Sequence, residues 1–141
     1  MQLKDMEPVV KKFYEGLEEG KLWGRRCLEC GAIEFPPHLA CNACGYHATE
    51  WCEVSGHGHL IDFTVPGPQN DKPYLREVGK YAYGAVELDE GPQYTYVIFG
   101  ITKKTAKDVR ARLMAGEKVG VHPKIIDRPG YKELCFELDE N

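Results

Sequence analysis

Four cysteines in two matching C-x-x-C-G motifs constrain this chain more than any other feature. Cys27 and Cys30 form the first motif, Cys41 and Cys44 form the second, and ten residues separate the two. The glycine after each pair allows a turn with positive φ, in which backbone N–H groups point at the sulfurs. Four thiolates arranged in this way give the tetrahedral site that Zn²⁺ prefers. The spacing therefore predicts a structural zinc ribbon with these four cysteines as ligands.

Three other chemistries use cysteines in similar patterns. Disulfides agree with the even total of six cysteines, but residues 1–8 contain no apolar run that would direct the chain to an oxidising compartment. A thioredoxin-like redox site has one C-x-x-C motif beside a β-α-β pattern, whereas this chain has two such motifs. Iron in a rubredoxin-like site uses the same four sulfurs, so the sequence leaves the choice between zinc and iron open.

Two histidines and two further cysteines lie near the motifs or in strand-like stretches. His38 and His47 are close enough to replace a sulfur, but four cysteines are already in register and we interpret both histidines as loop residues. Cys52 and Cys135 lie in strand-like stretches, where small buried side chains are typical. Neither thiol has a local histidine base, so we expect no catalytic residue and no catalysis by this chain alone.

Length and charge limit the class of protein. With 141 residues the chain has room for one ordinary domain and a small module. It has no apolar run near the roughly 20 residues that span a bilayer, and we expect a cytoplasmic protein without a membrane segment. The formal net charge of −4 argues against a general nucleic-acid binder.

Residues 101–128 carry a local positive charge. This stretch has eight Lys and Arg residues against three Asp and Glu residues. A basic patch on an acidic protein suits a small phosphorylated ligand better than a long polyanion. A solvated helix face is the other interpretation of the same residues, and the sequence does not separate the two.

The N-terminal stretch predicts a short helix over residues 6–19. Asp5 is placed to cap this helix. Val10, Phe13 and Leu17 recur at helical spacing and form a thin apolar stripe. The stripe has to pack either on this chain or on another protein, and we predict that it is a docking surface for a partner.

The remainder of the chain predicts a β-barrel. The strand-like stretches are 51–65, 81–88, 94–101, 118–126 and 132–138. A helix is expected over residues 105–115, between the third and fourth strands, and a long loop over residues 66–80. Five short strands with a helix in this place describe an OB-type barrel. We therefore predict a mainly β protein with an N-terminal helix (1–22), a rubredoxin-like zinc ribbon (23–50) and a five-stranded OB-fold domain (51–141).

Several segments of the chain recur together in one known family. They are residues 13–17 and 20–22, the two cysteine motifs with two prolines between them, and residues 51–58, 64–65, 85–91 and 116–119. With these segments the chain resembles the Zn-ribbon OB-fold family once catalogued as domain of unknown function 35. The resemblance covers nearly the whole chain, and the ordered combination of segments is far more specific than the cysteine motifs alone.

The resemblance implies an accessory role in CoA-ester chemistry. Members of the family look like acyl-CoA-associated subunits, and their genes accompany thiolases or hydratases. By resemblance, this chain is a non-catalytic subunit that docks on a thiolase-like enzyme in a hetero-oligomer and helps to bind acyl-CoA. Small subunits of thiolases, such as that of benzoylsuccinyl-CoA thiolase, are a specific example. Arginine and lysine suit the CoA phosphates, and we select Arg25, Arg26, Lys103 and Lys104 for that contact.

Three alternatives stay open at this point. An enoyl-CoA hydratase is the second candidate partner. A binder of single-stranded nucleic acid would stack bases on Tyr94 and Tyr96, or on Tyr81 and Tyr83, since each pair shares one face of a strand. A rubredoxin-like electron carrier would account for the cysteines and leave the barrel without a role.

Overall fold

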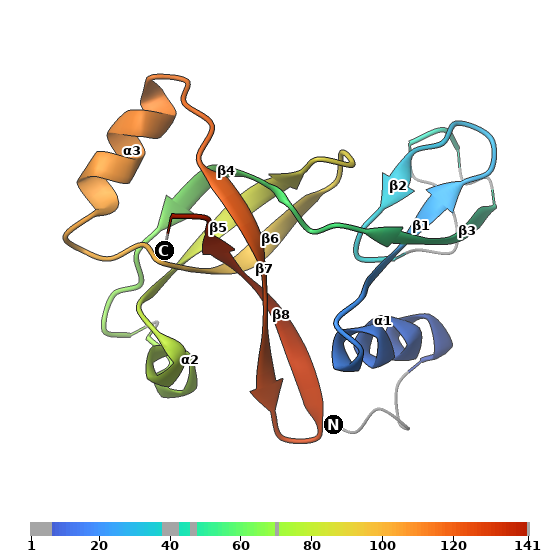
Figure 1. Cartoon of the computed structure of the whole chain (residues 1–141), viewed down its shortest axis with the longest axis horizontal. Coiled ribbons are helices and arrows are strands. Elements are labelled where there is room, and N and C mark those ends of the chain that lie inside the picture. Colours follow the sequence, from blue (N-terminus) through green and yellow to red (C-terminus); the bar gives the residue numbers. More distant parts are fainter. Residues whose placement is uncertain (1–6, 38–42, 46–47, 70, 141) are drawn as a thin grey trace. The chain divides into compact units, whose positions relative to one another are not determined.

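A computed structural model gives the fold of the chain, and Figure 1 shows its helices and strands. It describes residues 7–37, 43–45, 48–69 and 71–140. The chain forms two compact units. The first unit takes in the described residues of 1–56, 89–92 and 125–134, and the second those of 57–88, 93–124 and 135–141.

The first unit holds the predicted helix and ribbon. Helix α1 (Pro8–Glu18) precedes a three-stranded antiparallel sheet in the order β2-β1-β3. The strands are β1 (Leu22–Cys27), β2 (Ile33–Glu34) and β3 (Thr49–Val54). Because β1 is the central strand and pairs with β3 over its whole length, its last residue, Cys27, has a fixed position.

The apolar face of α1 packs within the first unit. Phe13 is 6% exposed and Leu17 is 1% exposed, whereas Val10 is 41% exposed. The ring centroids of Phe13 and Phe35 lie 5.6 Å apart. The predicted docking stripe is therefore wrong for Phe13 and Leu17, because both side chains fill the core of their own unit. Asp5, the expected cap of this helix, lies outside the described residues.

Truncation of Leu17 tests this packing. We expect Leu17→Ala to lower the free energy of unfolding by about 3 kcal/mol, because the loss of a buried leucine leaves a cavity. Val10→Ala is the matched control in the same helix, and it should change the stability by no more than about 0.5 kcal/mol. Urea denaturation followed by circular dichroism measures both variants. Equal effects at the two positions would contradict the burial of Leu17.

The second unit is built on a closed barrel with the strand order β4-β5-β6-β8-β7. Its strands are β4 (Gly58–Thr64), β5 (Tyr81–Leu88), β6 (Gln93–Phe99), β7 (Gly120–Arg128) and β8 (Tyr131–Leu138). β6 and β8 pair in parallel, and β4 pairs antiparallel with both β5 and β7. The tip of the β7–β8 hairpin, residues 125–134, belongs to the first unit. The predicted fold class, a mainly β chain with a helix, a zinc ribbon and a five-stranded OB-type barrel, is confirmed.

The stretch 51–65, which the sequence predicts as one barrel strand interrupted by glycines, forms two strands in different sheets. β3 pairs with β1 in the ribbon, and β4 pairs with β5 and β7 in the barrel. Gly56 lies between them with φ of +79°, a conformation that favours glycine. The ribbon sheet therefore extends to Val54, past the boundary that we predicted at residue 50.

A short helix stands where the sequence predicts only a loop. Helix α2 (Pro73–Val78) lies between β4 and β5, and α3 (Ala106–Met114) lies between β6 and β7 (Figure 1). Pro73 occupies the first turn of α2, where its fixed φ suits a helix, and Leu75 is 0% exposed. A helix of this length is too short to show apolar periodicity in a sequence. Within the described ranges, no helix has the length and apolar character that a bilayer crossing requires.

Candidate functional site

Three cysteine sulfurs converge at the end of β1. The Sγ atoms of Cys27, Cys30 and Cys44 all lie within 4.8 Å of one another. The Sγ atoms of Cys27 and Cys44 are 3.4 Å apart, whereas the sulfurs of a disulfide are about 2.05 Å apart. Two thiolates that bind one zinc ion tetrahedrally at about 2.3 Å lie about 3.8 Å apart. The geometry fits three ligands of one metal ion and does not fit disulfide bonds among these residues.

Backbone N–H groups surround the sulfur of Cys27. The N–H groups of Glu29 and Cys30 donate to Cys27 Sγ, each at 3.4 Å. Gly31 has φ of +78° and Gly45 has φ of +104°. The prediction that the glycine after each cysteine pair adopts positive φ is confirmed.

These donors favour the thiolate form of Cys27. The hydrogen bond from the N–H of Cys30 is the largest cause that lowers the pKa of Cys27 to about 6, and the bond from Glu29 acts in the same direction. Burial opposes this shift. Since the thiolate is the form of cysteine that binds metal ions, Cys27 is ready to bind a cation at neutral pH.

Acidification should release the metal. Zinc binds the thiolate forms of its ligands, so protons displace the metal as the pH falls. Because the pKa of Cys27 is lowered to about 6, this ligand holds a proton less strongly than an ordinary thiol. We expect full zinc retention at neutral pH and a progressive loss in acid. A chromogenic indicator that reports free zinc across a pH series measures the loss. Retention that is unchanged into strong acid would contradict the assignment of Cys27 as a ligand.

The fourth predicted ligand, Cys41, lies outside the described residues, as do His38 and His47. Three thiolates occupy three corners of a tetrahedron, and one further thiolate from the second motif would complete it. A site with four protein ligands has no open position for a substrate, so a metal held there supplies stability and shape.

The two remaining cysteines offer no activated nucleophile. Cys135 is 0% exposed, which confirms the prediction of a small buried residue. Cys52 is partly exposed, and burial raises the pKa of its thiol. A thiol with a raised pKa stays protonated at neutral pH and attacks poorly.

Arg25 and Arg26 both have hydrogen-bond acceptors within the first unit. Arg25 Nε donates to Thr49 Oγ1 at 3.0 Å, and its guanidinium lies 4.6 Å from the ring centroid of Trp51. Arg26 Nη2 donates to Glu50 Oε1 at 2.7 Å. Thr49, Glu50 and Trp51 all belong to β3, so the two arginines tie β1 to its neighbouring strand.

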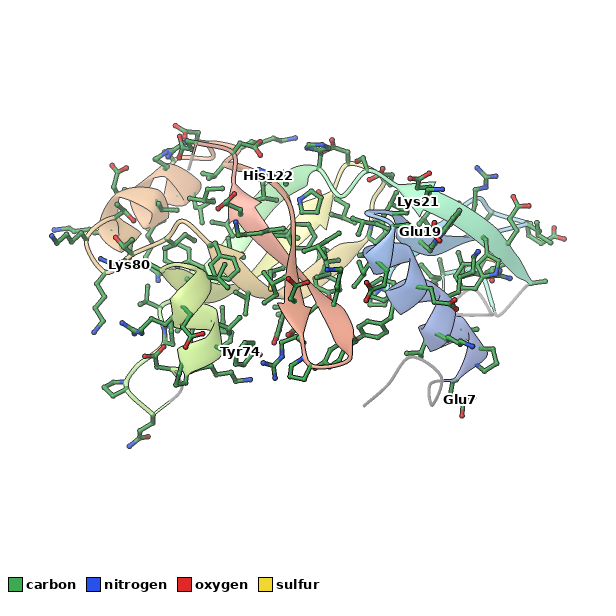
Figure 2. All side chains as sticks on the ribbon, turned by 60° about the horizontal axis from the view of Figure 1, so that its bottom comes forward. Glu7, Glu19, Lys21, Tyr74, Lys80 and His122 are labelled. Carbon is green, nitrogen blue, oxygen red and sulfur yellow. The ribbon has the colours of Figure 1, made fainter. Side chains whose placement is uncertain are left out.

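Lys103 and Lys104 line a cavity of about 280 Å³ in the second unit. Two cations that sequence analysis missed, Arg76 and Lys80, line the same cavity. Arg76 belongs to α2, and Figure 2 labels Lys80 just beyond the end of this helix. No local pattern joins the two pairs, because it is the antiparallel pairing of β5 with β6 that sets Tyr81 opposite Phe99 and so brings the start of β5 to the end of β6. Of the four cations selected from the sequence, this cavity contains only the two lysines.

A hydrogen-bonded network fixes the wall of this cavity. Tyr81 Oη donates to Asp71 Oδ1 at 2.9 Å and accepts the N–H of Lys72 at 2.7 Å. Arg76 Nη2 lies 2.6 Å from Asp71 Oδ2. Burial raises the pKa of Tyr81 to about 12, and the hydrogen bond from Arg76 lowers the pKa of Asp71. Asp71 is therefore an anion that holds both the Arg76 guanidinium and the Tyr81 hydroxyl in place.

The positive charge of residues 101–128 divides into two groups. The cations with a carboxylate oxygen within 4.0 Å are Arg110, Arg112, Lys124 and Arg128. In the part of the chain that the structure describes, the cations without such a carboxylate are Lys103, Lys104, Lys107 and Lys118. The helix-face interpretation holds for Lys107, Arg110 and Arg112, which lie on α3, whereas Lys103 and Lys104 line the cavity.

Three of the four tyrosines considered for base stacking contact other aromatic rings, and the hydroxyl of the fourth, Tyr96, lies 3.2 Å from that of Tyr74. The ring centroids of Tyr81 and Tyr83 lie 5.6 Å apart, and Tyr94 lies 5.6 Å from Phe136. Tyr81 is 4% exposed and Phe136 is 1% exposed. These contacts give the rings a role in packing the barrel.

A family model and two solved structures match this chain. Residues 15–50 match the model described as ChsH2, rubredoxin-like zinc ribbon domain. The chain is similar to a chain of the structure described as Ltp2-ChsH2(DUF35) aldolase, with a TM-score of 0.66 and 20% identity over 95% of this chain and 97% of that one. It is also similar to a DUF35 family protein of unknown function from Sulfolobus solfataricus, with a TM-score of 0.58 and 18% identity over 95% and 87% of the two chains.

These matches support zinc at the cysteine cluster, because the zinc-ribbon model spans both C-x-x-C-G motifs and the described sulfurs have the required geometry. The two solved structures establish the fold. A sequence relative, the DUF35 domain-containing scaffold protein of Methanothermobacter thermautotrophicus (strain Delta H), is 31% identical over 91 residues, which cover 64% of this chain and 67% of that protein. The resemblance predicted from the sequence is thereby confirmed, and the chain belongs to the DUF35 family.

Proposed function

We propose that this chain is a non-catalytic accessory subunit of a complex that processes CoA esters, and that its catalytic partner is a thiolase. The observation that carries the proposal is the relationship to an archaeal DUF35 protein that is described as a scaffold. A scaffold contributes binding surface and leaves the chemistry to its partner. The buried Cys135 and the protonated Cys52 agree with this division of roles, because a thiolase needs an activated cysteine.

The zinc ribbon has a structural part in this proposal. Cys27, Cys30 and Cys44 hold the ion together with Cys41, and the ion fixes the short strands around it. The N-terminal helix remains our proposed docking element. Its contact with a partner would involve Val10 and the other exposed side chains of α1, since Phe13 and Leu17 are buried.

The contact with CoA phosphates is proposed for Lys103 and Lys104. Both lysines line a cavity, and neither has a carboxylate neighbour among the described residues. The contact of Arg25 and Arg26 with the CoA phosphates also remains a prediction. They would have to give up their bonds to Thr49 and Glu50 to bind a phosphate, which makes them the weaker choice.

The reaction that we propose for the partner is that of a thiolase. The structure described as Ltp2-ChsH2(DUF35) aldolase pairs a DUF35 chain with a second component. Aldolases and thiolases both make or break a carbon–carbon bond next to a carbonyl group, so this neighbour supports a thiolase more than a hydratase. An enoyl-CoA hydratase remains the alternative partner.

Affinity capture of the tagged chain from its native cells tests the proposal. We expect mass spectrometry to identify a thiolase as a stoichiometric partner that is absent from an untagged control. Recovery of an enoyl-CoA hydratase would show that the partner is the hydratase and not a thiolase. Recovery of no enzyme that acts on CoA esters would contradict the proposed function.

A further inference from the structure

The three cysteines of the cluster differ in their access to solvent. Cys27 is 3% exposed, Cys44 is partly exposed and Cys30 is exposed. Zinc binds its cysteine ligands as thiolates, and the thiolate is also the form of cysteine that attacks oxidants. Because two of these cysteines reach the surface, a small oxidant in solution can meet a thiolate of the cluster without any opening of the fold.

Cys27 and Cys44 lie close enough to form a disulfide after a small movement. Their Sγ atoms are 3.4 Å apart, and bonded sulfurs lie about 2.05 Å apart. The N–H of Cys27 donates to the carbonyl of Ala32 at 2.8 Å, and its carbonyl accepts the N–H of Gly31 at 3.1 Å, so the backbone holds this residue in place. Cys44 lies in a turn, and its approach to Cys27 need not break the pairing of β1 with β2 or β3.

We propose that Cys27 and Cys44 are a site of reversible oxidation, where a hydroperoxide joins them in a disulfide and thereby releases the zinc ion. The Cys44 thiolate attacks one oxygen of hydrogen peroxide, which breaks the O–O bond, forms a sulfenic acid and releases hydroxide. The Cys27 thiolate then attacks the sulfur of Cys44, so that the S–S bond forms and the S–O bond breaks with loss of a second hydroxide. The two sulfurs together lose two electrons, the peroxide is reduced, and two protons from solvent convert the two hydroxides to water.

Oxidation of this pair should open the ribbon. The disulfide removes two of the four thiolates, and two remaining protein ligands are too few for a structural zinc site. Zinc leaves as the divalent ion, and the small ribbon sheet then loses the bonds that stabilise it. Reduction of the disulfide restores the thiolates and allows zinc to bind again. This inference does not require the proposed accessory role, because the sulfurs and the metal site all belong to this chain.

Treatment of the zinc-loaded full-length chain with one equivalent of hydrogen peroxide tests the proposal. A chromogenic indicator should record zinc release together with the loss of two thiols for each ion released. Dithiothreitol followed by zinc should restore both the thiols and the bound metal. Zinc that stays bound while other thiols are oxidised would overturn the proposal, and so would release through sulfinic acids that dithiothreitol does not reduce.

Peptide mapping identifies the pair that forms. Cleavage after glutamate places Cys27, Cys30 and Cys44 in three different peptides. Tandem mass spectrometry then distinguishes Cys44 from Cys41, which share one peptide. We expect the link between Cys27 and Cys44. A link between Cys27 and Cys30, or one that contains Cys41 in place of Cys44, would overturn the assignment.

Cys44→His is the matched variant for the kinetics of release. Histidine can take the place of one thiolate in a zinc site with three cysteines, but it cannot form a disulfide. The zinc-loaded variant should therefore release zinc at least about tenfold more slowly than the wild-type chain in peroxide. Cys52→Ser is the control outside the cluster and should release zinc at the wild-type rate. Release from Cys44→His at the wild-type rate would overturn the proposal, and the peptide map of the wild-type chain tests the pair without either variant.

Discussion

Removal of zinc should unfold the ribbon while the barrel strands stay paired. The ribbon sheet includes a strand of only two residues, Ile33–Glu34, and a segment this small buries too little apolar surface to be stable alone. Thiolate–zinc bonds contribute about 10 kcal/mol or more to the folding of such modules. Limited proteolysis and hydrogen exchange after treatment with a strong chelator should show loss of protection in residues 22–54 and retained protection in β5 and β6.

Single cysteine variants sharpen this test. Cys30→Ser and Cys44→Ser remove sulfurs of the cluster, and we expect each variant to lose zinc and to expose the ribbon to protease. Cys52→Ser is the matched control, because Cys52 lies on β3 of the same sheet and outside the sulfur cluster. It should keep one zinc ion per chain. A chelated protein with unchanged protection in the ribbon would refute a structural role for the metal.

Adding a methyl group at Gly58 should destabilise the barrel by about 3 kcal/mol or more. A Cβ atom at this position would lie 2.1 Å from the carbonyl oxygen of Glu87 and 2.9 Å from the Cα atom of Leu88. Both are backbone atoms of β5, so the strands would have to separate. Gly58→Ala should therefore lower the thermal midpoint of the barrel, as measured by calorimetry.

Gly67→Ala provides the comparison for Gly58→Ala. A Cβ atom at Gly67 meets nothing within 4 Å, and this residue has no positive φ. Its substitution should leave the thermal midpoint unchanged or raise it slightly, since alanine lowers the entropy of the unfolded chain. A similar loss at both positions would contradict the close approach of β4 and β5 at Gly58 as the cause of the effect.

The cysteine cluster could be predicted from the sequence because residues close together in the chain determine its geometry. The spacing within each motif and the glycine that follows it determine where the sulfurs lie, and the structure brings Cys27, Cys30 and Cys44 together as expected. The strand predicted over residues 81–88 agrees with β5 at both ends, because alternation and a clear turn mark its limits.

Features that depend on distant contacts could not be predicted. Periodicity reports that Phe13 and Leu17 share a helix face, but it does not say whether that face meets this chain or another protein. In the structure it meets Phe35. Similarly, Arg76 and Lys80 join the lysines of the cavity through the pairing of β5 with β6, and the strand sequences do not show the register of that pairing.

Turnover of an acyl-CoA thioester tests the central claim most directly. The purified, zinc-loaded chain should produce no free CoA from the thioester, because Cys135 is buried, the raised pKa of Cys52 keeps its thiol protonated, and zinc occupies the thiolates of the cluster. The partner identified by affinity capture should be slow alone and should gain at least tenfold in kcat/KM when this chain is added. Turnover by this chain alone, or a partner whose kcat/KM does not respond to it, would contradict the account.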